Sequence, residues 1–208
     1  MENQLCLQSL LGLVSLGEED VTEAAVKLLK ATLEKGLEGN PDTTTFSALE
    51  ENITSTTLQM CLARKDWDVP SHNLVAMFQI LALIKKQHCD SVNPTSGDMK
   101  LLYHACCIIK KDTTSVGLCA AVLGYLCCVL VQSKLHNDIQ ASSLLLTDSE
   151  LLNQLHHLVT SSTNKVSSSS CIILSVLLLQ QHSNKLNVRT HLFSVLNLLS
   201  SSCLTSFC

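Results

Sequence analysis

Apolar residues recur along the chain at helical spacing. One recurring pattern has an aliphatic residue at position i, a central pair at i+3 and i+4, and a further pair at i+7 and i+8. Apolar residues at these spacings lie on one face of an α-helix. The copies are Val21-x-x-Ala24-Ala25-x-x-Leu28-Leu29, Leu74-x-x-Met77-Phe78-x-x-Leu81-Ala82, Val116-x-x-Cys119-Ala120-x-x-Leu123-Gly124 and Val166-x-x-Ser169-Ser170-x-x-Ile173-Leu174. In three copies the central residues are small, so we expect a neighbouring helix to approach closely there.

The copies begin 53, 42 and 50 residues apart. Helical units with a period of roughly 40 to 50 residues are typical of α-solenoids. The sequence therefore predicts an all-α fold, a right-handed α-solenoid of about eight to ten helices. We expect residues 1–208 to form a single domain of this kind. The first helix has no convincing cap and the end stays apolar through Phe207-Cys208, so a fragment of a longer array is also an expectation.

Periodicity and capping residues set the expected helix limits. The predicted helices cover residues 2–17, 21–35, 44–65, 72–86, 98–110, 113–131, 148–161, 167–181 and 187–200. Asp112 or Thr113 is expected to cap the most apolar of them. Thr147-x-x-Glu150 reads as a capping box, and the serines at 167–170 as the opening of a helix. Residues 134–143 show a looser pattern.

The composition agrees with a helical protein. Hydrophobic residues make up 46% of the chain but aromatic residues only 3%, which is too few for the strands of an all-β domain. Three prolines and seven glycines leave room for long helices with short connections.

Charge is unevenly distributed. Residues 1–68 hold twelve acidic and five basic side chains, and the remainder six acidic and nine basic ones. Neither part carries the dense basic patch of a nucleic-acid-binding surface, so we expect no direct nucleic-acid partner. Lys85-Lys86, Lys100 and Lys110-Lys111 are interpreted as solvated residues near helix ends.

Eleven cysteines lie mostly within apolar stripes, and no signal peptide opens the chain. This arrangement favours a reducing compartment and an intracellular protein, nuclear or cytoplasmic. Cys106-Cys107, Cys119 and Cys127-Cys128 are expected to pack as small hydrophobic residues.

Catalytic and metal-binding patterns are weak. His104 and Cys107 are three residues apart on a predicted helix, but no C-x-x-C pair or repeated histidine spacing accompanies them, and His156-His157 are adjacent. The sequence has no G-x-S-x-G elbow, glycine-rich phosphate loop or H-E-x-x-H motif. We therefore expect no enzyme activity, cofactor, metal or small-molecule substrate. A thiol-dependent enzyme remains an alternative because many cysteine and histidine pairs are available.

Residues 113–133 contain no charge and are long enough to cross a bilayer of roughly 30 Å hydrocarbon thickness. A membrane protein with one span at 113–133 is the second alternative. Gly117, Gly124 and Tyr125 lower its hydrophobicity and no aromatic belt marks its ends, so a buried solenoid helix is the preferred interpretation.

The small-small-x-x-Leu spacing and the succession of helices resemble armadillo and HEAT repeat proteins. No asparagine recurs in register, so the resemblance implies no asparagine ladder for peptides. The Leu, Ser and Cys-rich texture of residues 24–29 and 143–146 is similar to that of the armadillo-like meiosis inhibitor proteins, which implies a nuclear role in meiotic double-strand break formation.

The function expected from these features is a non-catalytic scaffold that binds other proteins in a groove along its inner helices. Trp67, alone in a predicted loop, is a candidate partner anchor because tryptophan is frequent in binding hot spots.

Overall fold

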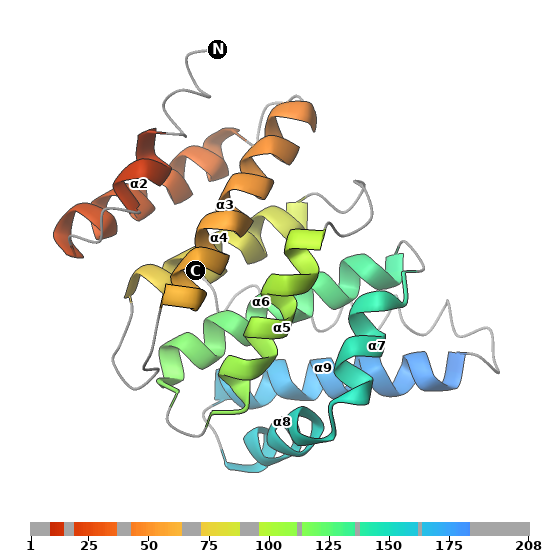
Figure 1. The fold of residues 1–208 in the computed structure, drawn as a ribbon. Coiled ribbons are helices and arrows are strands. Elements are labelled where there is room, and N and C mark those ends of the chain that lie inside the picture. Colours follow the sequence, from red (N-terminus) through yellow and green to blue (C-terminus); the bar gives the residue numbers. More distant parts are fainter. Residues whose placement is uncertain are drawn as a thin grey trace.

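The computed structural model describes residues 9–14, 19–36, 43–63, 72–87, 96–111, 114–135, 138–161 and 164–183. Regular secondary structure in these ranges is entirely helical, which confirms the all-α prediction. A helical segment at 9–14 precedes the helices labelled in Figure 1: α2 Glu19–Gly36, α3 Thr43–Ala63, α4 His72–Gln87, α5 Ser96–Ile109, α6 Val116–Leu135, α7 Gln140–Thr147, α8 Ser149–Ser161 and α9 Asn164–Ser183.

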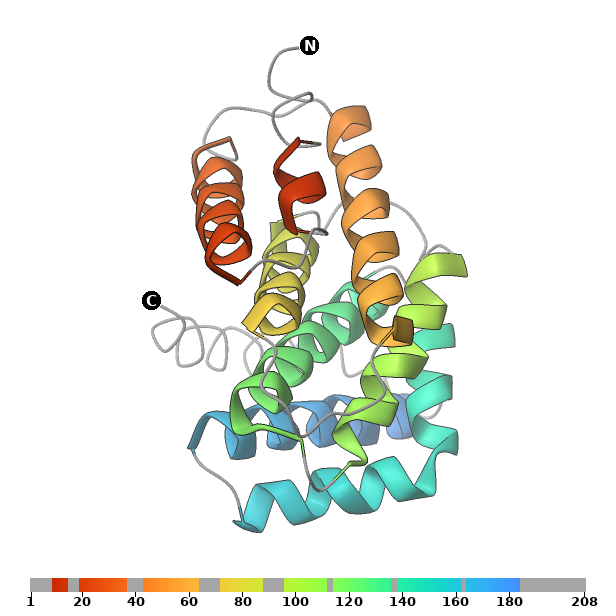
Figure 2. The same cartoon turned by 60° about the vertical axis from the view of Figure 1, so that its left-hand side comes forward.

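Contacts between the helices define two rows. In the first row α2 packs on α4, α4 on α6 and α6 on α9. In the second row α3 packs on α5 and α5 on α8, while α3 also contacts α4, α5 contacts α6 and α8 contacts α9. The short α7 bridges α5, α6, α8 and α9. In Figure 2, α2 and α3 stand upright whereas α8 and α9 lie across the bottom, so the helix axes rotate along the rows.

The four copies of the recurring pattern fall on α2, α4, α6 and α9, the four helices of the first row. Their central residues Ala25, Cys119, Ser169 and Ser170 are buried. At the α6–α9 contact the Cys127 sulfur lies 3.6 Å from the Ser169 carbonyl oxygen. Ser169 belongs to the recurring pattern, whereas Cys127 lies eight positions after Cys119 and outside it, so the close approach expected at the central residues stays a prediction.

The core contains an aromatic pair between two helices of the first row. Phe78 of α4 and Tyr125 of α6 are fully buried, and their ring centroids are 5.6 Å apart at a tilted angle. Aromatic pairs at this separation stabilise a core beyond the effect of area burial. Of the cysteines expected to pack as small hydrophobic residues, Cys106 and Cys119 are buried, and Cys107, Cys127 and Cys128 are half-buried.

Several helix limits differ from the predictions. Residues 140–147 form α7, although no helix was expected between 131 and 148. The helix escaped prediction because eight residues are too few to show a clear helical periodicity. Helix α6 begins at Val116, where the Leu118 amide approaches the Ser115 hydroxyl oxygen at 3.4 Å. Helix α9 begins at Asn164, so the serines at 167–170 lie inside the helix and not at its start.

The interpretation of Lys85 as a solvated residue is wrong. Its side chain is 6% exposed and pairs with Glu50 of α3 and Asp98 of α5, at 2.5 and 3.2 Å from the lysine nitrogen. Burial alone would lower the pKa of Lys85, but the charges of Asp98 and Glu50 outweigh it and raise the pKa. This buried ionic cluster joins three helices of both rows. Lys86, the next residue, is exposed.

Candidate functional site

Three of the four first-row helices each expose a large apolar side chain. The side chains of Leu28 on α2, Val116 on α6 and Leu178 on α9 are 54%, 60% and 56% exposed. The second row also exposes large apolar side chains, Leu62 on α3 at 62% and Tyr103 on α5 at 55%, and most other exposed residues of both rows are polar. Exposed apolar side chains indicate an interaction face where they form one contiguous patch. We call the outward side of α2, α4, α6 and α9 the apolar face.

Helix α6 lies at the centre of this row. It is the one helix among the described residues that is long and apolar enough to cross a membrane, but 61% of its most apolar stretch is buried inside the structure. It contacts α4, α5, α7 and α9. A central helix of a water-soluble protein has the same length and composition as a membrane span, so these properties alone do not distinguish the two.

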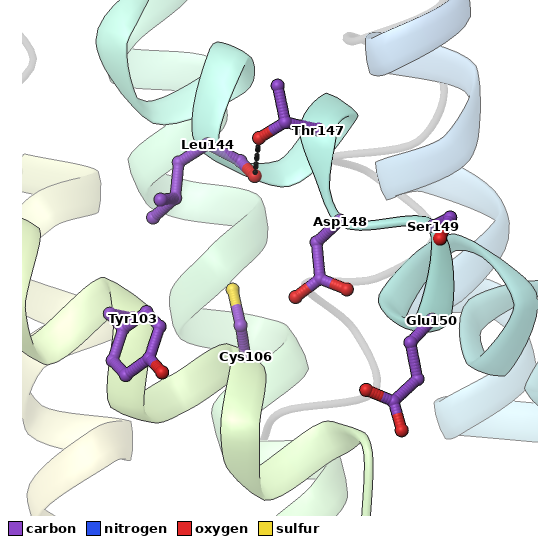
Figure 3. Close-up of a pocket in the computed structure, with 7 residues that line it drawn as sticks. All are labelled: Tyr103, Cys106, Leu144, Thr147, Asp148, Ser149 and Glu150. Carbon is purple, nitrogen blue, oxygen red and sulfur yellow. Dashed lines mark hydrogen bonds between the residues drawn. The ribbon is translucent and has the colours of Figure 1, made fainter.

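A pocket of about 430 Å³ opens between α5 and the junction of α7 with α8 (Figure 3). Its lining consists of Tyr103 and Cys106 from α5, Leu144 and Thr147 from α7, and Asp148, Ser149 and Glu150 around the start of α8. This volume lies near the lower end of the roughly 300–1,000 Å³ range of ligand pockets.

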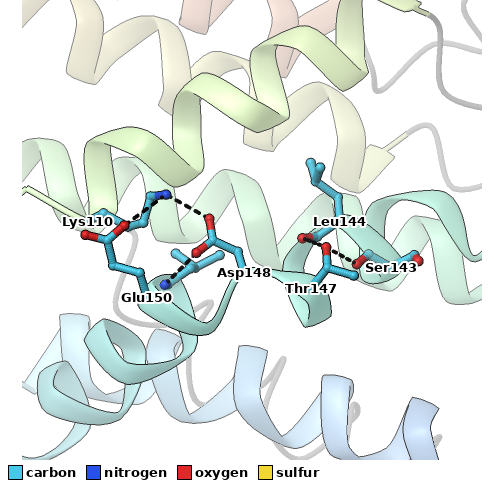
Figure 4. Close-up of polar contacts among 7 residues, drawn as sticks. Lys110, Ser143, Leu144, Thr147, Asp148 and Glu150 are labelled. Carbon is cyan, nitrogen blue, oxygen red and sulfur yellow. Dashed lines mark hydrogen bonds and ion pairs between the residues drawn. The ribbon is translucent and has the colours of Figure 1, made fainter.

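An ion-pair cluster holds one side of this pocket together (Figure 4). The Lys110 ammonium donates a hydrogen bond of 2.8 Å to Asp148 Oδ2 and lies 3.3 Å from Glu150 Oε2. These carboxylates raise the pKa of Lys110, with the hydrogen bond to Asp148 as the largest cause. The cluster ties the end of α5 to the start of α8.

Asp148 also caps α8, since its Oδ1 accepts a hydrogen bond of 3.0 Å from the Leu151 amide. Burial alone would raise the pKa of Asp148, but the hydrogen bonds from Lys110 and Leu151 outweigh it and lower the pKa. The expected Thr147-x-x-Glu150 capping box is therefore wrong by one residue. The Thr147 hydroxyl instead donates back to the carbonyl oxygens of Ser143 and Leu144, each at 3.0 Å.

The thiol that points into the pocket is poorly suited to nucleophilic chemistry. Burial, reinforced by the charge of Asp148, raises the pKa of Cys106 to about 12. Burial likewise raises the pKa of Cys119 to about 11. The thiolate is the reactive form of cysteine, and at neutral pH both side chains are neutral thiols. The pocket is therefore a polar contact region between α5, α7 and α8, and its two carboxylates, Asp148 and Glu150, form ion pairs with Lys110.

Other sequence candidates remain dispersed. His104 and Cys107 are both half-buried on α5, and His156 and His157 are exposed on α8. Within the described ranges, no three His, Cys, Asp or Glu residues are placed to hold a metal ion. Trp67 lies outside the described residues, so its proposed role as an anchor stays a prediction.

The Lys110 cluster was missed by the sequence reasoning because Lys110 and Asp148 are 38 positions apart. A local signal could have located the α8 side of this cluster. Asp148 directly precedes Ser149-Glu150-Leu151-Leu152, which is the order expected of an N-cap residue followed by an acidic first turn.

Comparison of the chain with protein-family models, with curated proteins and with solved structures finds no match.

Proposed function

We propose that the chain is a non-catalytic protein–protein interaction scaffold whose helices stack as a right-handed α-solenoid of the armadillo and HEAT type. The observation that carries the proposal is the position of the recurring pattern, whose four copies lie on α2, α4, α6 and α9, helices that pack on one another in succession. A pattern repeated on successive helices of one row is what a repeat architecture requires. The rotation of the helix axes in Figure 2 also supports a stacked superhelix.

The apolar face is the proposed docking surface. Leu28 and Val116 project from it and are more than half exposed. Helix α4 lies between the two helices that carry them, and apolar side chains this exposed favour binding to another protein where they form one patch. The partner would therefore present an apolar surface, and we expect affinity to change little with salt concentration.

The buried thiols of Cys106 and Cys119 support a function without thiol catalysis. Cys106 and Cys119 have raised pKa values, so a thiol-dependent enzyme would have to use another cysteine. The proposed location is intracellular, nuclear or cytoplasmic, and the lack of disulfides among the described cysteines is compatible with it. A nuclear, meiotic role belongs to the proposal only through the similarity to meiosis inhibitor proteins.

A membrane protein is the second candidate, because α6 has the length and composition of a spanning helix. The contacts of α6 with α4, α5, α7 and α9 favour the scaffold instead, since they supply a protein environment for most of its apolar surface. Expression without detergent separates the two functions.

Paired variants test the docking surface. Leu28→Glu and Val116→Glu place charges on the apolar face at exposed positions, and Asn153→Glu places the same charge on the polar side of α8. Partners are identified by proximity labelling in cells, and circular dichroism verifies the fold of each variant. The proposal expects proteins that are recovered with the unmodified chain and with Asn153→Glu but lost with the other two variants. Recovery that is unaffected by both face variants, or reduced equally by all three, contradicts it.

A further inference from the structure

The pocket between α5, α7 and α8 has two chemically different sides. Figure 3 shows Tyr103 and Leu144 on one side and Asp148 and Glu150 on the other, with the Cys106 thiol between them. An aromatic ring and an aliphatic side chain therefore face two carboxylates. A pocket that combines apolar walls with a few polar groups orients a ligand that is apolar along its length and polar at one end.

The charge of the pocket is negative. Both charged residues of its lining, Asp148 and Glu150, are acidic. Lys110 beside the pocket pairs with both of them, at 2.8 and 3.3 Å, so two carboxylates share one ammonium and a negative charge remains in excess. Lys100 and Lys111 are exposed on α5 but do not line the pocket. The pocket is therefore complementary to a cation.

The two carboxylates differ in what already holds them. Asp148 Oδ2 accepts a hydrogen bond from Lys110, and Asp148 Oδ1 accepts one from the Leu151 amide. Glu150 is held less firmly, since its side chain is 74% exposed and its contact with Lys110 is the longer of the two. A ligand can therefore pair with Glu150 while Asp148 keeps its place as the cap of α8.

Two further groups of the lining take no part in these ion pairs. The Tyr103 side chain is 55% exposed, and a T-shaped contact with His104, with ring centroids 5.8 Å apart, orients its ring. An exposed aromatic face attracts a cation. The Cys106 thiol is only 3% exposed, points into the pocket and donates no hydrogen bond to another described residue. Its sulfur is a weak hydrogen-bond acceptor, so both groups remain available to a ligand.

We propose that this pocket binds the side chain of an arginine that a partner protein presents. The aliphatic part of the arginine packs between Leu144 and Tyr103, and its guanidinium lies on the Tyr103 ring and donates hydrogen bonds to Glu150. Long basic side chains are apolar along the stem and charged at the tip, which matches the two sides of the pocket. Arginine fits better than lysine because the planar guanidinium both stacks on aromatic rings and binds a carboxylate through two parallel hydrogen bonds. A volume of about 430 Å³ is enough for one such side chain.

The arginine pocket is separate from the apolar face. Its lining comes from α5, α7 and the start of α8, and none of it lies on α2, α4, α6 or α9. The proposal therefore goes beyond the docking surface proposed above and does not depend on it. Attraction between exposed charges weakens as salt is added, whereas binding at the apolar face should change little. Salt dependence thus distinguishes the two sites, and failure of one leaves the other standing.

Nuclear magnetic resonance of the full chain, labelled with ¹⁵N, tests the pocket directly. The probe is the peptide Gly-Arg-Gly with an acetylated amino end and an amidated carboxyl end. Its matched control contains citrulline in place of arginine, which keeps the shape of the side chain but removes the charge. The test variant is Glu150→Gln, and the control variant is Glu51→Gln at an exposed position of α3. Circular dichroism verifies the fold of both variants.

We expect the arginine peptide to shift the amide signals of Tyr103, Cys106, Ser149 and Glu150, with saturation in the millimolar range. The citrulline peptide should bind about tenfold more weakly, because it loses both the ion pair and the attraction to the ring. Glu150→Gln should weaken the arginine peptide about threefold, as expected for an exposed ion pair, and Glu51→Gln should bind like the unmodified chain. An increase in sodium chloride from about 0.05 M to about 0.5 M should also weaken binding.

Equal affinities of the arginine and citrulline peptides overturn the proposal, as does equal weakening by Glu150→Gln and Glu51→Gln. Shifts confined to amides outside the pocket, or no shifts at all, overturn it as well. Free arginine is the last ligand in the series. If it binds more tightly than the capped peptide, the pocket recognises a free amino acid, and the assignment to a partner protein is wrong.

Discussion

Replacement of Lys85 by methionine tests the buried ionic cluster that joins α3, α4 and α5. The side chains of Lys85, Glu50 and Asp98 are only 6%, 15% and 10% exposed, and the two lysine contacts measure 2.5 and 3.2 Å. Methionine keeps the length of the side chain but removes its charge. Two carboxylates then remain inside the protein without their cation.

Removal of one partner from a buried ion pair costs about 3–5 kcal/mol, because the remaining charge has lost both its water and its counter-ion. For a protein of this size each kcal/mol lowers the melting temperature by about 2–4 °C, so we expect a fall of roughly 6–20 °C. Urea unfolding followed by circular dichroism measures the free energy directly. Lys86→Met is the matched control, and at this exposed position we expect a change within about 0.5 kcal/mol.

The pH dependence gives an independent signature. In the unmodified protein the pKa of Lys85 is raised above 10.5, so its contribution to stability is complete below pH 10.5 and is lost as the pH rises through the folded-state pKa. Lys85→Met lacks this titrating group, so the difference in unfolding free energy between the two proteins should narrow as the pH rises through the folded-state pKa of Lys85. A loss below about 1 kcal/mol, or an equal loss in Lys86→Met, would refute the reasoning.

Two further perturbations concern the joint between α5 and α8. Asp148→Ala should destabilise the protein by about 1–2 kcal/mol in urea unfolding, because it removes the cap of α8, whereas Ser149→Ala should change stability by less than about 0.5 kcal/mol. Since the pKa of Asp148 is lowered, the stability that Asp148 contributes is complete above pH 3.8 and declines only as the pH falls through its folded-state pKa. Similar unfolding free energies for Asp148→Ala and Ser149→Ala would contradict the assignment of Asp148 as the cap. At pH 8 Cys106, with a pKa of about 12, should react with iodoacetamide at least about tenfold more slowly than the exposed Cys171, and comparable rates by mass spectrometry would show that Cys106 is accessible as a thiolate.

Helical periodicity was sufficient to predict the all-α fold. Residues at i, i+3, i+4 and i+7 lie on one side of a helix, so the sequence of a single segment is enough to indicate which side packs. Helix α7 escaped prediction because Gln140–Thr147 is only eight residues long and includes two serines. The start of α9 was placed too late because the serines at 167–170 resemble a cap but lie within the helix, where Ser169 and Ser170 are buried.

The polar clusters could not be predicted because their members come from different helices. Lys85 pairs with Glu50 on the helix before its own and with Asp98 on the helix after it, and neither partner is near Lys85 in the sequence. Helical phase places Lys85 on the same side as the buried Leu81 and Leu74, and that was the signal that could have suggested its burial. The partners of Lys110 are similarly distant, since they depend on how α8 meets α5.

Native-state hydrogen exchange on the full chain, purified without detergent, is the most direct test of the central claim that α6 is the core helix of a stacked helical scaffold. The account predicts that the chain is recovered from aqueous buffer and that amides of α6 exchange most slowly among the described helices, at rates set by global unfolding. Recovery only from membranes or detergent, or fast exchange throughout Val116–Leu135 in the folded protein, would contradict it.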